Sequence, residues 1–146
     1  MKTRIITALI GLPVFLGLMY KGGYYTKILV FAMIISGLIE LFKIIKINDK
    51  AIILSIIIFS GITVFLSEFL SLFNIAILLM FTLFIIFIKK FNEDNKINYM
   101  NFVKCTQGLF VYFYVTVTLY HLILLRDFDE GFKYVFFMFI IILFAL

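Results

Sequence analysis

The sequence predicts an all-α, polytopic transmembrane protein, because of its composition and because of where its charges lie. Of its 146 residues, 65% are hydrophobic and 14% are charged. A soluble domain has about 45–50% apolar and about 25% charged residues, so this chain carries more apolar surface than a soluble fold can hide from water. The charges fall in short segments between long apolar runs, as they do between transmembrane helices.

Five full spans and a truncated sixth are expected. The first follows a short basic start and contains Pro13, which would kink it, with Gly11 and Gly17, which would allow close helix contact. A cleaved signal peptide is not expected, because Leu18 to Lys21 offers no small-x-small cleavage site. The third and fourth spans are short and would form an antiparallel hairpin. The expected spans are residues 5–20, 27–45, 51–66, 75–88, 102–125 and, incomplete, 134–146.

The last apolar run, Tyr134 to Leu146, contains 13 residues. A membrane span needs about 20 residues, and no cap or basic flank closes this one. We therefore expect residues 1–146 to be the transmembrane front part of a longer protein.

The basic residues predict the orientation of the chain. Its net charge is +5, and the basic residues lie in loops between apolar runs. This placement indicates that they set the orientation of the chain in the membrane and contact lipid headgroups, rather than bind nucleic acid. Most of them belong to the N-terminus and to the loops after the second and fourth spans, which places the N-terminus in the cytoplasm. The nine basic residues on the cytoplasmic side are Lys2, Arg4, Lys43, Lys46, Lys50, Lys89, Lys90, Lys96 and Lys104. The four on the opposite side are Lys21, Lys27, Arg126 and Lys133.

Glu40 is the most informative single polar residue. An acidic residue in or near a span is costly and often functional. It would also lie close to the end of its span, one helical turn before Lys43, with which it could form an ion pair. Both interpretations stay open.

The other polar residues have simpler interpretations. His121 is expected to be an interfacial side chain, since no second His or Cys cluster completes a metal site. Asp127, Asp129 and Glu130 are expected in a solvated turn, balanced by flanking basic residues. Cys105 is the only cysteine, so it forms no intrachain disulfide, and it is expected to be an inert core or lipid-facing residue.

Three stretches of the chain resemble bacterial phosphatidate cytidylyltransferases (CDP-diacylglycerol synthases). The first is the start, MKTRIITALIGLP; the second is Gly37 to Phe42, GLIELF. The third runs from Tyr120 to Leu146, with a Gly-containing turn before a new apolar span. The resemblance implies an enzyme of the bacterial inner membrane that transfers CMP from CTP to phosphatidic acid in phospholipid biosynthesis. It also implies Mg²⁺ as cofactor, and the sequence allows a homodimer.

The diagnostic signature of that family, with its His-Gly-Gly and Asp-Arg-x-Asp motifs, does not occur in this sequence, where His121 is followed by Leu122. No catalytic, cofactor-binding or metal-binding residue is therefore assigned. The resemblance implies that the catalytic C-terminal half is absent from residues 1–146 and that this part alone is inactive. Two other readings are a small helical-hairpin transporter or channel subunit that uses Glu40, and a membrane-embedded assembly or regulatory subunit.

Overall fold

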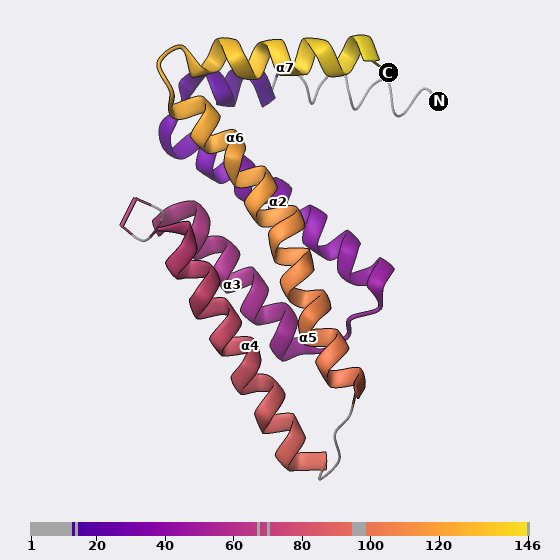
Figure 1. Ribbon diagram of the computed structural model, residues 1–146. Helices are drawn as coiled ribbons and strands as arrows, with labels where there is room; N and C mark the ends of the chain where they lie inside the picture. Colours follow the sequence, from indigo (N-terminus) through magenta and orange to yellow (C-terminus); the bar gives the residue numbers. More distant parts are fainter. Residues whose placement is uncertain (1–12, 14, 67, 70, 95–98, 146) are drawn as a thin grey trace. The chain divides into compact units, whose positions relative to one another are not determined.

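The computed structural model describes residues 13, 15–66, 68, 69, 71–94 and 99–145, and the regular structure in these ranges is helical, with no strand (Figure 1). The prediction of an all-α protein is confirmed. Residues 15–21 are helical and precede α2. The elements that follow are α2 (Gly23–Ile45), α3 (Lys50–Leu66), α4 (Leu72–Asp94), α5 (Tyr99–Val111), the π-helix η1 (Tyr112–Val117), α6 (Thr118–Asp127) and α7 (Gly131–Ala145).

The expected count of spans is not confirmed. Within the described ranges, three helical stretches are long and apolar enough to cross a membrane: Gly23–Ile45, Leu72–Lys89 and Phe102–Asp127. The apolar helices Lys50–Leu66 and Gly131–Ile141 are shorter than that. Residues 5–12 of the first expected span lie outside the described residues.

Two of the helices extend beyond the expected spans. The second helix begins at Gly23 instead of residue 27, because the chain turns at Gly22 and Gly23, whose φ angles are +71° and +55°. The polar stretch after residue 88 was expected to be a loop, but α4 continues through it to Asp94. Lys and Glu are good helix formers, so a polar sequence does not by itself end a helix.

The chain divides into two compact units. Residues 31–120 form what we call the hairpin unit, and residues 1–30 with 121–146 form the terminal unit.

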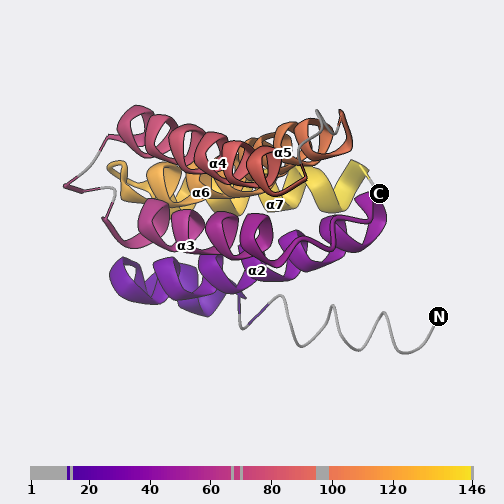
Figure 2. The same cartoon turned by 90° about the horizontal axis from the view of Figure 1, so that it is seen from below.

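In the hairpin unit, α3 and α4 form the expected antiparallel hairpin and α5 packs beside them (Figures 1 and 2). Apolar residues at four-residue spacing face inward, among them Ile52 and Ile56 of α3 and Leu79 and Leu83 of α4. A Cβ at Gly108 would lie 3.0 Å from Ile52 Cγ2, so this glycine allows α5 to approach α3 closely.

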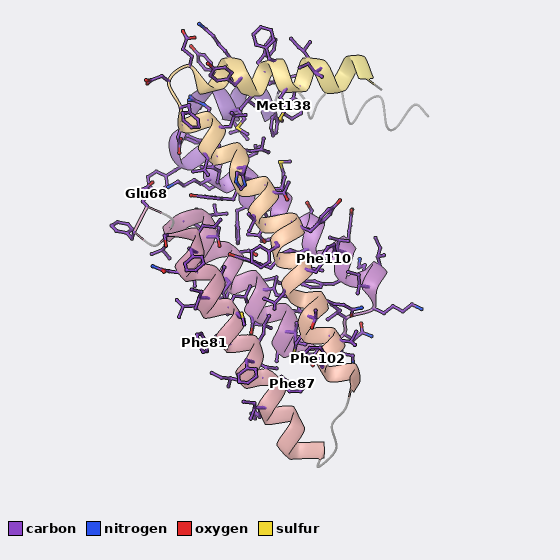
Figure 3. The ribbon with its side chains drawn as sticks, in the orientation of Figure 1. Glu68, Phe81, Phe87, Phe102, Phe110 and Met138 are labelled. Carbon is purple, nitrogen blue, oxygen red and sulfur yellow. The ribbon has the colours of Figure 1, made fainter. Side chains whose placement is uncertain are left out.

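The outer side of α4 is lined with apolar side chains. Phe81 is 61% exposed and points away from the bundle (Figure 3). Nearer the end of the helix, the Phe87 ring lies 6.0 Å from the Phe102 ring of α5 (Figure 3). An apolar outer face is what a helix needs where its neighbour is a lipid chain rather than water.

In the terminal unit, α7 packs against the helix of residues 15–21. Phe15 contacts Phe139, with ring centroids 4.6 Å apart, and Tyr20 contacts Phe132 at 5.4 Å. The close helix contact expected at Gly17 is not found, since no described atom lies within 4 Å of its Cβ position. Gly11 lies outside the described residues.

Candidate functional site

Two hydroxyl pairs join α3 to η1 inside the hairpin unit. Ser60 Oγ lies 2.7 Å from Thr116 Oγ1, and Thr63 Oγ1 lies 2.6 Å from the Tyr112 hydroxyl. All four side chains are buried. Interhelical hydrogen bonds of this kind stabilise helix packing inside a membrane.

The direction of these hydrogen bonds follows from the proton that each hydroxyl carries. Ser60 Oγ donates to the backbone carbonyl of Ile56 and Thr63 Oγ1 donates to that of Phe59. Ser60 and Thr63 are then the acceptors across the interface, and Thr116 and Tyr112 are the donors. Sequence reasoning missed this cluster, although small hydroxyl residues three apart in an apolar helix are the signal that could have indicated it.

Glu40 lies in an apolar hollow on the surface of the hairpin unit, with a volume of about 430 Å³. One wall comes from α2 and the other from η1 and α6. The lining residues are Gly37, Glu40, Leu41, Ile44, Tyr114, Val115, Thr118 and Leu119.

The expected ion pair between Glu40 and Lys43 is not formed. Both side chains are exposed and no ion pair joins them, whereas Lys133 does pair with Glu130. A helical pair of this type is worth only about 0.2–0.5 kcal/mol, which is too little to hold two exposed side chains together. Glu40 therefore presents to the hollow a carboxylate that forms no ion pair with Lys43.

Arg126 closes the end of the helix of residues 15–21, within the terminal unit. Its Nε donates to the carbonyl of Met19 at 2.7 Å and its terminal nitrogen Nη2 donates to that of Tyr20 at 3.1 Å. The last carbonyls of a helix have no partner inside the helix, so a guanidinium there satisfies two of them and also interacts favourably with the helix dipole. Of the basic residues that flank the acidic turn, Lys133 pairs with Glu130 as expected, whereas the hydrogen bonds of Arg126 go to Met19 and Tyr20.

The remaining residues singled out from the sequence do not come together. Cys105 is buried and its Sγ donates to the carbonyl of Leu83, as expected for an inert core residue. Asp127 at the end of α6 is exposed, as are Asp129 and Glu130 in the turn before α7 and His121 on α6. Across the described ranges, no three His, Cys, Asp or Glu side chains are close enough to hold a metal ion. The described side chains thus do not fit the Mg²⁺ that the resemblance implies.

The features described so far are those of a helical membrane scaffold. The class of reaction is inferred from comparison with known proteins. A sequence profile described as the Cytidylyltransferase family matches residues 2–145. The chain belongs to the cytidylyltransferase family. No curated protein and no solved structure matches the chain. Membership in the cytidylyltransferase family confirms the resemblance, supports a nucleotidyltransferase that uses CTP, and favours the enzyme over the transporter and subunit readings.

Proposed function

We propose that the protein is an integral membrane phosphatidate cytidylyltransferase, which makes CDP-diacylglycerol for phospholipid biosynthesis. The observation that carries the proposal is the family match over residues 2–145. The long apolar helices support a lipid acceptor, because an enzyme that acts on a membrane lipid must meet its substrate at the bilayer. Phosphatidic acid ends in a phosphate monoester, whose oxygen can accept a CMP group.

In the proposed reaction, a phosphate oxygen of phosphatidic acid attacks the α-phosphorus of CTP. The bond between that phosphorus and the oxygen bridging to the β-phosphate breaks, and pyrophosphate leaves. Such a transfer needs positive charge around the phosphates, which Mg²⁺ supplies in most enzymes of this kind. We propose that the ligands of this ion lie outside the described residues. The described acidic groups are spread over α2, the turns before and after α3, the end of α4, the end of α6 and the turn before α7.

We further propose that the protein lies in the bacterial inner membrane with its N-terminus in the cytoplasm. The excess of basic residues at the N-terminus and around the α2–α3 and α4–α5 connections supports this orientation. CTP is a cytoplasmic metabolite, and lysines on that side would attract anionic lipids at about 1 kcal/mol each. Cysteine labelling at Asn95 from outside intact cells should fail, and labelling at Glu130 should succeed. The reverse pattern would contradict the orientation.

The activity can be tested with radiolabelled CTP, phosphatidic acid and Mg²⁺ in detergent micelles. The product of the complete gene should form labelled CDP-diacylglycerol. Residues 1–146 assayed alone should form none, because their described acidic residues do not converge on one site. Product formation by residues 1–146 alone would contradict the assignment of the chemistry to residues beyond those described.

A further inference from the structure

The hollow that contains Glu40 has the chemistry of a lipid site. Its walls are mostly apolar and include the side chains of Leu41, Ile44 and Leu119. The hollow follows α2 from Gly37 to Ile44, a separation of seven positions, which corresponds to about 10 Å at the rise of an α-helix. That length suits part of an extended acyl chain. It lies on the outside of a helix that is long enough to cross a membrane.

Two neighbouring residues on the α2 side of the hollow carry charges of opposite sign. Glu40 lines the hollow, and Lys43 follows it by three residues on the same helix. Both side chains are exposed and do not pair with each other. Side chains at this spacing have Cβ atoms about 5–6 Å apart. A zwitterionic headgroup, in which two carbons separate an ammonium from a phosphate, matches this spacing and both signs.

We propose that this hollow binds a phospholipid whose headgroup carries a primary ammonium, of the phosphatidylethanolamine type. The ammonium donates hydrogen bonds to the Glu40 carboxylate, the phosphate meets Lys43, and an acyl chain lies along the apolar walls. Hydrogen bonds to an ionised acceptor are stronger than those between neutral groups, so the carboxylate should select a headgroup that can donate.

The same charges argue against other occupants. An anionic lipid would place its negative headgroup beside Glu40. A choline headgroup has no N–H to donate to the carboxylate. A basic helix from another protein would pair with Glu40 but would be repelled by Lys43. The proposed lipid is also distinct from the proposed substrate, since phosphatidic acid has no ammonium group.

Native mass spectrometry of the purified protein in detergent, titrated with defined lipids, tests the proposal without relying on enzymatic activity. The unmodified protein should bind phosphatidylethanolamine more tightly than phosphatidylcholine or phosphatidylglycerol of the same acyl chains. Glu40→Gln should weaken phosphatidylethanolamine binding about tenfold, equivalent to about 1.4 kcal/mol, and should leave phosphatidylcholine binding unchanged. Glu68→Gln, which removes an exposed carboxylate outside the hollow, is the matched control and should have no effect.

Successive methylation of the lipid amine offers a second test that needs no variant. Affinity should fall as each N–H is replaced, and should be lowest for the trimethylated headgroup. Equal affinity across the methylation series would overturn the proposal, as would a Glu40→Gln protein that keeps the preference for phosphatidylethanolamine. Tighter binding of phosphatidic acid than of phosphatidylethanolamine at this site would also overturn it, whatever the outcome of the activity assay.

Discussion

Replacing Gly22 by alanine should destabilise the terminal unit through two separate effects. The backbone of Gly22 has a φ of +71°, a region that costs an L-residue roughly 1–2 kcal/mol. A Cβ at this position would also lie 2.8 Å from Nη2 of Arg126, so the guanidinium would have to move. Moving it puts at risk its hydrogen bonds to Met19 and Tyr20, each worth about 1.5–3 kcal/mol when a charged group takes part.

Gly23 provides a control for the backbone effect alone. Its φ is +55°, but its Cβ position has no described atom within 4 Å. Gly23→Ala should therefore cost about 1–2 kcal/mol, and Gly22→Ala should cost about 1.5–3 kcal/mol more if one charged hydrogen bond is lost. Equilibrium unfolding in mixed micelles, followed by circular dichroism, gives both values.

A double-mutant cycle assigns the difference to Arg126. In an Arg126→Ala background the collision no longer exists, so Gly22→Ala should cost no more than Gly23→Ala does. The reasoning would be refuted if both glycine variants had the same effect in the unmodified protein. It would also be refuted if the extra cost at Gly22 persisted without Arg126.

Three further predictions concern stability and use the same unfolding measurement. Thr63→Val should lower the free energy of unfolding more than Tyr112→Phe does. Thr63→Val leaves the buried Tyr112 hydroxyl without its acceptor, at about 1–3 kcal/mol, whereas after Tyr112→Phe the Thr63 hydroxyl still donates to its own helix. The opposite order would contradict the assigned hydrogen-bond directions. Gly131→Ala should cost about 3 kcal/mol or more, because a Cβ there would overlap the carbonyl oxygens of Leu125 and Arg126. Gly17 has open space around its Cβ position, so Gly17→Ala should instead stabilise its helix by about 0.5–1 kcal/mol. Equal effects of Gly131→Ala and Gly17→Ala would contradict the geometry of the turn before Gly131. Lys46→Gly should stabilise the end of α2 by about 1 kcal/mol, because Lys46 has a φ of 60° in a position that glycine usually takes, where Ile47 N–H bonds back to Phe42 O; a loss of stability would contradict it.

The fold class could be predicted because composition alone requires it. A chain with 65% hydrophobic residues and unbroken apolar runs has few alternatives to membrane helices. The bounds of α3 agree with the predicted span to within a residue. Cys105 was predicted to be an inert residue either in the core or facing lipid, and the structure places it in the core.

The polar contacts could not be predicted, because they depend on distances that the sequence does not contain. Ser60 and Thr116 are 56 residues apart and meet only when α3 and η1 pack. Arg126 donates hydrogen bonds to carbonyl groups more than a hundred positions away. Every residue has a backbone carbonyl, so residue types cannot show which carbonyls an arginine will reach. The Glu40–Lys43 pair failed for the opposite reason, because helical spacing permits such a pair but stabilises it too weakly to ensure it.

Dual labelling of CTP tests the proposed function most directly. The complete gene product is incubated with phosphatidic acid, Mg²⁺ and CTP labelled in one sample at the α-phosphate and in another at the γ-phosphate. Transfer of CMP predicts that the α-label enters the lipid fraction and that the γ-label is released as pyrophosphate in equal amount. A γ-label in the lipid, or no transfer of the α-label to phosphatidic acid, would contradict the proposed phosphatidate cytidylyltransferase activity.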